Sequence, residues 1–312
     1  MSSFHLDDNF NLARKAQALD MRARLISSIR HFFIQQDFLE VETPLRIPAP
    51  APEEHIEAIP SDNWFLQTSP ELCMKRLLAA GYSRIFQFSK CFRAAERGSK
   101  HLPEFTLLEW YVAQFDYCQL MDQCEAMLMS AFENMGYDQN IIWQNKKMNL
   151  ASPWERISVA EAFSKYAQVS CQEALRQDKF DEIMVEHIEP CLGIDQPIFI
   201  YDYPAKLAAL AKIKKSDPTV AERFELYIGG LELANGFSEL TDAREQRQRF
   251  EEASKARALK KWAHYPMPAK FLNSLETLPP CAGIALGIDR LAMIMANTGK
   301  IDDVVAFTPE TL

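Results

Sequence analysis

The chain has 312 residues, of which 48% are hydrophobic and 25% charged, and its formal net charge at pH 7 is −9. This composition is ordinary for a globular protein and excludes collagen, coiled-coil and disordered classes. No stretch approaches the ~20 apolar residues of a membrane span, and the polar, acidic start MSSFHLDDNF is unlike a signal peptide. We therefore expect a cytoplasmic protein with no membrane partner. The acidic balance also disfavours nucleic acid as a dominant partner, because such affinity comes mainly from neutralised phosphates.

Seven cysteines are scattered along the chain without a C-x-x-C pair. An odd number without metal-ligand spacing predicts neither a disulfide framework nor a zinc site, so we expect reduced thiols in the core. The P-loop, G-x-G-x-x-G, G-x-S-x-G and H-E-x-x-H motifs are all missing from the sequence. Any bound phosphates are therefore expected to be held by arginine and magnesium rather than by a glycine-rich loop.

Hydrophobic periodicity predicts a helix over 11–36 and a strand over 38–43, which ends at Pro44. Five prolines between 44 and 60 predict a surface loop. Residues 69–71, Ser-Pro-Glu, are typical of a helix start. Further along, we expect strands over 84–92 and 105–115, a helix to about 136, and a mostly helical region over 147–195.

The last third of the chain has clearer signals. A buried strand is predicted over 197–203, and two strand-like runs joined by Gly229-Gly230 predict a hairpin. Residues 242–261 are dense in charge and predict a solvated helix, whereas 282–297 reads as strand, glycine, helix. Strands paired by hairpins with helices between them predict an α+β fold with a mainly antiparallel sheet flanked by helices.

The run 105–115 contains a glutamate in an unusual setting. Phe105, Leu107, Glu109 and Tyr111 share one face of the strand by period-two alternation. A carboxylate among apolar neighbours is costly unless it has a partner. Glu109 therefore either pairs with an Arg or Lys purely for folding or belongs to a binding site.

The hairpin places two more carboxylates near each other. With Gly229-Gly230 as the turn, Tyr227 lies opposite Glu232, and Glu225 shares the parity of Tyr227. Glu225 and Glu232 then become diagonal neighbours on one face, roughly 7–8 Å apart between Cα atoms. Such a pair can bracket Mg²⁺; the alternative is that both point to solvent.

Three further side chains alternate on one face just beyond the hairpin: Asn235, Phe237 and Glu239. Two polar residues flanking an aromatic ring suit a ligand with an aliphatic stem and a cationic end, although a strand edge with one buried Phe is the simpler alternative. Arg93 ends a strand, and Arg290 enters a helix near its N-terminus, where an anion is favoured. Each signal is weak alone, but their order along the chain is informative.

That order resembles the catalytic domain of class II aminoacyl-tRNA synthetases. RHFFIQQDFLEVETP (30–44) is similar to the dimer-forming motif 1, FRAAERGSKHLPEFTLLEWY (92–111) to motif 2, and AGIALGIDRLAMI (282–294) to motif 3. IYDYP (200–204) and FELYIGGLELANGFSEL (224–240) are similar to the lysyl branch in particular. The resemblance covers roughly 20–312, which implies a single catalytic domain over 1–312, a homodimer, and an enzyme that uses ATP and Mg²⁺.

The resemblance also implies roles for individual residues. Arg93 would contact the α-phosphate and the substrate carboxylate, and Arg290 would hold the far phosphates, so these two are the expected catalytic residues. The other residues implied to bind ATP are Glu96, His101, Phe105, Glu232 and Gly287. Mg²⁺ would be held by Glu225 and Glu232. A lysine-like substrate would be lined by Glu71, Glu109, Tyr111, Asn235, Phe237, Glu239 and Ala285.

Two features depart from lysyl-tRNA synthetases. The resemblance begins near residue 20, so the OB-fold anticodon-binding domain is expected to be missing, and Ala285 stands where lysyl enzymes have glycine. Both features resemble the family of elongation factor P–(R)-β-lysine ligases. That family implies activation of (R)-β-lysine, or lysine, as an acyl-adenylate and its transfer to a lysine of elongation factor P, not to tRNA. The alternatives are a minimal lysyl-tRNA synthetase that charges tRNA and a catalytically inactive regulatory paralogue.

Overall fold

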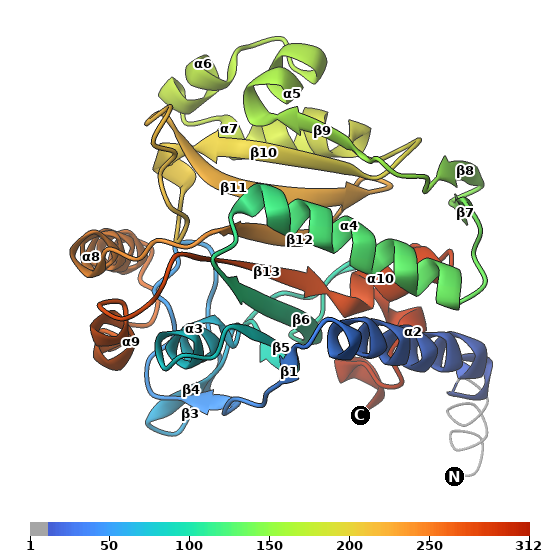
Figure 1. The fold of residues 1–312 in the computed structure, drawn as a ribbon, viewed down its shortest axis with the longest axis horizontal. Coiled ribbons are helices and arrows are strands. Elements are labelled where there is room, and N and C mark those ends of the chain that lie inside the picture. The colour runs from blue at the N-terminus through green and yellow to red at the C-terminus, as the bar shows by residue number, and fades with distance from the viewer. Residues whose placement is uncertain (1–11) are drawn as a thin grey trace.

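The computed structural model describes residues 12–312, and an eight-stranded sheet runs through its centre (Figure 1). The strands of this sheet, in chain order, are β1 (Leu39–Glu40), β5 (Arg84–Phe92), β6 (Glu104–Ala113), β9 (Glu155–Ser158), β10 (Ile198–Pro204), β11 (Val220–Ile228), β12 (Leu231–Ser238) and β13 (Cys281–Gly287). Their spatial order is β1-β5-β6-β13-β12-β11-β10-β9. Only the two outermost pairs, β1–β5 and β9–β10, are parallel. The predicted α+β fold with a mainly antiparallel sheet is confirmed.

Three helices cover one face of this sheet (Figure 1). They are α2 (Ala16–Gln35), α4 (Tyr117–Asn134) and α10 (Ile288–Met295). The largest apolar core lies between them and the sheet, and side chains such as Phe33, Trp110 and Leu128 are fully buried in it. Asp289 on α10 accepts hydrogen bonds from Arg22 on α2 and from the backbone of Thr106, which fixes both helices to β6.

The opposite face carries the polar residues singled out from the sequence. It is flanked by α3 (Glu71–Ala79), α8 (Ala243–Leu259) and α9 (Ala269–Ser274), which gather at the left of Figure 1. A smaller core that includes Tyr111, Phe250 and Phe271 joins these helices to the sheet. The segment that precedes α3 forms a separate three-stranded sheet, with strands β2 (Arg46–Ile47), β3 (Pro60–Ser61) and β4 (Trp64–Leu66).

Several predicted elements are confirmed closely. The 84–92 strand, the hairpin at Gly229-Gly230, the charged helix over 242–261 and the strand-to-helix segment over 282–297 all form within a few residues of the expected bounds. The helix predicted over 11–36 is present as α2, and residue 11 lies outside the described residues. The helix start at 69–71 is also present, with Ser69 Oγ accepting from the Glu71 N–H at 3.0 Å.

Other expectations were wrong. The strand over 38–43 has only two residues, because only Leu39 and Glu40 pair with β5. The region over 147–195 is less helical than expected, since it contains β9, which pairs in parallel with β10 and forms one edge of the sheet. A hairpin of β7 (Asn140–Trp143) and β8 (Lys146–Asn149) was not predicted. The helical segments there are α5 (Val159–Tyr166), α6 (Cys171–Arg176), α7 (Phe180–Ile183), a π-helical turn (Met184–Ile188) and a 3-10 turn (Glu189–Cys191).

The proline-rich segment between 44 and 60 is not a simple surface loop. Ala51 and Ala58 are buried, and Arg257 of α8, itself 2% exposed, donates to the carbonyl oxygens of Glu53 and Ile56. The segment therefore packs into the structure beside α8. Its polar backbone is held by a buried guanidinium, which a pattern of prolines does not reveal.

All seven cysteines are free, as predicted, but they are not all in the core. Cys91, Cys124 and Cys281 are buried, whereas Cys118 and Cys191 are exposed. Within residues 12–312, no helix has the length and apolar character needed to cross a bilayer.

Candidate active site

Three adjacent strands bring the predicted residues into rows on one face. The pairing of β6, β13 and β12 places Ala285 beside both Glu109 and Asn235. One step along, Gly283 pairs with Tyr111 on one side and Phe237 on the other. Residues far apart in the sequence therefore meet because antiparallel neighbours share side-chain parity across the sheet.

The hairpin contains a β-bulge that was not predicted. Gly229 and Gly230 have φ angles of +63° and +73°, as a tight two-residue turn requires, and Tyr227 pairs with Glu232 as expected. The next pair is Leu226 with Ala234, so Leu233 is the extra residue on β12. An inserted residue reverses the side-chain parity of the rest of the strand. Because of this reversal, Glu232 lies on the same face as Asn235 and Phe237.

At one end of this face lies a carboxylate cluster, which we define as Glu71, Lys75, Glu109, Tyr111 and Glu239. The exposed fractions of Glu109 and Glu239 are only 1% and 2%. Lys75 Nζ lies 2.5 Å from Glu71 Oε1 and also contacts Glu239 Oε2, and Tyr111 donates to Glu109 Oε2 at 2.9 Å. Glu109 Oε1 and Glu239 Oε1 have no hydrogen-bond partner among the described residues.

Burial and like charge act together on these carboxylates. Burial, reinforced by the charge of Glu71, raises the pKa of Glu109 to about 8. Burial also raises the pKa of Glu239 to about 8, with Glu71 adding to the shift and Lys75 opposing it. Burial alone would lower the pKa of Lys75, but Glu239 and Glu71 together raise it, so this ammonium stays charged. Each of the two carboxyl groups has one oxygen without a partner among the described residues, and a ligand cation at these oxygens would favour the ionised form of both groups.

A glycine makes the cluster sterically possible. A Cβ atom at Gly283 would lie 2.2 Å from the ring of Tyr111 and 2.6 Å from Glu239 Oε1. Both distances are well below van der Waals contact, so only glycine lets these two side chains pass over β13. Ala285, two residues further along β13, is half-buried and pairs with Glu109 on β6 and with Asn235 on β12.

The other end of the face is basic. Arg93 follows β5, and its guanidinium lies 5.0 Å from the centroid of the Phe105 ring. The Arg93 Nη1 atom is 3.9 Å from Glu96 Oε1, and the buried Nε atom has no partner among the described residues. Glu96 follows Ala95, whose φ of +61° turns the chain sharply after the strand. The arginine is thus held over an aromatic ring with part of its donor capacity unused.

Arg290 and His101 complete what we define as the arginine cluster: Arg93, His101, Glu232 and Arg290. Arg290 donates to the Glu232 carbonyl oxygen at 2.8 Å and lies 2.6 Å from His101 Nε2. Burial and the adjacent Arg290 charge lower the pKa of His101, so the ring is neutral and its nitrogen accepts. The Arg290 side chain is 24% exposed, so a ligand from solution can reach the cluster.

The predicted metal pair is on β11 and β12, and one of its two members, Glu232, belongs to the arginine cluster. Glu225 Oε1 accepts from Arg223 at 2.6 Å, and Oε2 accepts from Tyr203 at 2.6 Å and Tyr227 at 2.8 Å. Burial and the nearby Glu232 carboxylate raise the pKa of Glu225 to about 7. Because a carboxylate has about four acceptor positions, one remains on Glu225 for a cation. Within residues 12–312, no group of three or more His, Cys, Asp or Glu is arranged to hold a metal.

Four residues at or near the site were missed from the sequence: Lys75, Tyr203 and Arg223, which contact predicted residues, and Glu53, whose charge interacts with theirs. Lys75 is one helical turn after Glu71, a spacing that indicates a side-chain pair. Arg223 shares the strand parity of Glu225, and it also donates to Asn235 Oδ1 at 3.2 Å. Burial raises the pKa of Glu53 to about 7, with the Glu71 charge adding to the shift. No local pattern indicates that the loop carrying Glu53 lies near these charges.

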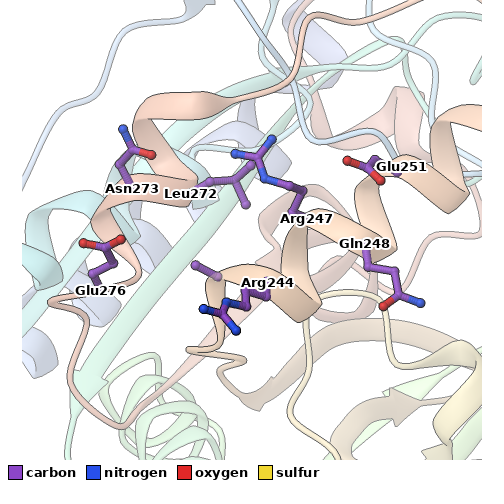
Figure 2. Close-up of a pocket in the computed structure, with 8 residues that line it drawn as sticks. Arg244, Arg247, Gln248, Glu251, Leu272, Asn273 and Glu276 are labelled. Carbon is purple, nitrogen blue, oxygen red and sulfur yellow. The ribbon is translucent and has the colours of Figure 1, made fainter.

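A separate hollow of roughly 300 Å³ lies between α8 and α9 (Figure 2). None of the residues singled out from the sequence lines it. Its polar lining mixes both signs of charge: Arg244, Arg247, Gln248, Glu251, Asn273 and Glu276. The two clusters on the sheet, and not this hollow, therefore form the candidate active site.

Comparison with known proteins shows the family of the chain. Residues 8–311 match the family described as tRNA synthetases class II (D, K and N). A protein of Proteus mirabilis named elongation factor P–(R)-β-lysine ligase is 39% identical over 302 residues, covering 92% of this chain and 93% of that protein. Proteins of the same name from Pectobacterium carotovorum and Salmonella typhi are 39% and 38% identical over 305 and 303 residues. These cover 93% and 92% of this chain, and 94% and 93% of their own lengths. The chain belongs to the class II tRNA synthetase family.

Proposed function

We propose that this protein is an ATP-dependent ligase that activates (R)-β-lysine as an acyl-adenylate and transfers it to a lysine side chain of elongation factor P. The observation that carries the proposal is the division of one sheet face into a buried carboxylate cluster and an open arginine cluster. The first suits an amine and the second suits phosphates. The names of the relatives, which align over more than nine tenths of the chain, supply the substrate and the acceptor.

Activation needs alignment and charge stabilisation more than proton transfer. The substrate carboxylate is ionised at neutral pH and attacks the α-phosphorus of ATP, so that an acyl–phosphate bond forms and pyrophosphate leaves. In this proposal Arg93 and Arg290 stabilise the charge on the phosphates. In the second step the neutral acceptor amine attacks the carbonyl carbon, forms an amide and releases AMP.

Magnesium fits the carboxylate pair of Glu225 and Glu232. Burial and then the Glu232 charge raise the pKa of Glu225, and a cation between the two carboxylates would relieve their mutual repulsion. Two carboxylates are few for a protein-only site, but Mg²⁺ commonly uses one or two carboxylates together with substrate phosphates. When bound, the ion would neutralise phosphate charge. Glu232, whose side chain is 39% exposed, is the more accessible of the two.

The remaining predicted residues line the space between the clusters. Asn235 and Phe237 project beside Glu225 and Lys75, where they would contact the stem of the amino acid. Ala285 adds a methyl group between Glu109 and Asn235. A methyl in a close-fitting site shifts preference by about 1–3 kcal/mol, which favours a lysine isomer with a displaced amine.

A homodimer through motif 1 is part of the proposal. Ile34 at the end of α2 and Leu39 in the edge strand β1 are 56% and 50% exposed. Large apolar side chains next to an unpaired strand edge are typical of an interface. Sedimentation of the wild-type protein and of an Ile34→Glu/Leu39→Glu variant tests this: the variant is expected to sediment as a monomer.

The acceptor is identified by following a labelled amino acid. Lysine or (R)-β-lysine is offered with ATP, and transfer is measured into purified elongation factor P and into total tRNA. We expect label on the protein that survives RNase and alkali and is greater with β-lysine. Label in alkali-labile, RNase-sensitive material would instead show a minimal tRNA synthetase.

A further inference from the structure

Lys75 is an ammonium held inside the protein. Its side chain is 1% exposed and its Nζ atom bridges Glu71 and Glu239. The rings of Phe237 and Phe271 lie 5.1 Å and 5.9 Å from the same atom. A buried ammonium is tolerated only with partners of this kind, since its desolvation is costly.

A role in folding alone does not explain this arrangement. Well-packed apolar side chains stabilise a core as well as a buried ion pair does, or better. Here the ion pair leaves Glu239 Oε1 without a hydrogen-bond partner among the described residues, and Glu109 Oε1 also has no such partner. A buried acceptor without a donor destabilises the free protein. The arrangement is explained if a ligand cation supplies the missing donor.

We propose that Lys75 is a specificity-determining residue that acts through Glu239. Its ammonium holds one oxygen of that carboxyl group in place, so that the other oxygen, which has no partner among the described residues, receives an amine of the amino-acid substrate. The inference rests on the proposed function and extends it to a residue outside the expected substrate contacts. Lys75 itself does not need to touch the substrate.

The charge state of Glu239 depends on groups from three elements. They are Lys75 and Glu71 from α3, Glu109 and Tyr111 from β6, and Cys281 from β13. Of these, Lys75 is the cation that lowers the pKa of Glu239, whereas burial and the other carboxylates raise it. Without Lys75, Glu239 keeps its proton at higher pH and stops distinguishing an ammonium from a methyl group.

The test is a ratio of specificities. For wild type and Lys75→Met, kcat/KM in ATP–pyrophosphate exchange is measured at pH 7.5 with (R)-β-lysine and with an isostere whose side-chain ammonium is replaced by methyl. We expect the ratio of the two values to fall at least tenfold in the variant, to recover in part at pH 9.5, and the KM for ATP to stay unchanged. Lys270→Met, at an exposed lysine of α9, is the matched control.

The outcomes separate the two proposals. A wild-type protein that exchanges pyrophosphate with no lysine isomer would overturn the proposed function. An active wild type with an unchanged ratio in Lys75→Met would overturn only the role of Lys75. If Lys75→Met does not fold, Lys75→Arg decides the question: the retained cation is expected to keep the ratio within threefold of wild type, and a folded Arg variant that loses it tenfold contradicts the inference.

Discussion

The carboxylate cluster and the arginine cluster share one face of one sheet but differ in burial. Glu109 and Glu239 are almost wholly buried, whereas the Arg290 and Glu232 side chains are 24% and 39% exposed. Charges in a low-dielectric environment interact strongly and hold unusual protonation states, whereas exposed charges are screened by salt. We therefore expect the first cluster to set selectivity and pH dependence, and the second to set phosphate affinity and transition-state charge.

The largest effect is expected at the arginine cluster. Arg290→Ala removes a cation that we propose holds the phosphates of ATP, and it leaves the carboxylate cluster intact. Loss of such a group commonly reduces kcat by about 10²–10³-fold. Pyrophosphate exchange is therefore expected to fall about a thousandfold, with little change in the binding of the amino acid measured by calorimetry without ATP.

The matched control for this substitution is Arg244→Ala, at the hollow between α8 and α9. It removes the same charge and is expected to leave the exchange rate unchanged. Equal activity of Arg290→Ala and wild type would contradict the role assigned to the arginine cluster.

The reverse experiment disturbs only the buried cluster. In Gly283→Ala, the new Cβ atom would overlap the Tyr111 ring and Glu239 Oε1, so both must move. Forced overpacking costs about 1–3 kcal/mol, and the acceptor oxygen leaves its position. We expect the KM for the amino acid to rise about tenfold or more while the KM for ATP stays the same.

Gly299→Ala is the matched control for Gly283→Ala. A Cβ there meets only Gln144 Nε2, at an ordinary 3.6 Å. Its thermal stability and both KM values are expected to match wild type. If Gly283→Ala raised the KM for ATP as much as that for the amino acid, the two clusters would not be separable.

The features of the sheet and of the site that depend on a local sequence pattern could be predicted from the sequence. The bounds of β5 and the tight turn at Gly229-Gly230 follow from alternation and turn chemistry over a few residues. Glu109 stood out because its neighbours are apolar. In contrast, β9 was missed and β1 was predicted too long, because the existence of the first and the length of the second depend on pairing with a distant strand.

The least predictable features are those that join distant segments. Lys75 and Glu239 are on different elements far apart in the chain, and their contact follows from the packing of α3 against the sheet. The bulge at Leu233 is similar, because the turn fixes only the first pairs of the hairpin and not the insertion after them. Without the bulge, Glu232 and Asn235 would face opposite sides of the sheet.

A smaller effect is expected in the pH dependence of amine binding, which depends on the carboxylate cluster and not on the arginine cluster. Glu109 and Glu239, with pKa values raised to about 8, hold protons at pH 7 in the free protein. A bound ammonium favours the ionised carboxylates and lowers these pKa values, so protons are released. Affinity is therefore expected to rise between pH 6 and about 8, while the amine, with a pKa near 10.4, stays charged.

Calorimetry in two buffers of different ionisation enthalpy measures this release. We expect about one proton per bound lysine at pH 7 and almost none at pH 9.5, where both carboxylates are already ionised. The methyl isostere of lysine is the control and is expected to release none. Binding of lysine at pH 7 without proton release would show that the carboxylates are ionised before the ligand arrives.

The smallest effect is expected where the arginine cluster is supported from outside. Arg97 lies in the loop between β5 and β6 and pairs with Glu310 at 2.8 Å and with Asp302 at 2.9 Å. The Ile301 N–H also donates to the Ser99 carbonyl oxygen at 2.8 Å, so the C-terminal segment holds the loop that carries His101. Exposed ion pairs contribute little and are screened by salt.

For Arg97→Ala we expect a rise of about two- to threefold in the KM for ATP. The difference between variant and wild type is expected to disappear at high ionic strength, because salt then weakens the ion pairs of the wild-type protein as well. A rise in the KM for the amino acid instead would mean that support of the loop extends to the buried cluster, and the division of the site into two independent halves would fail.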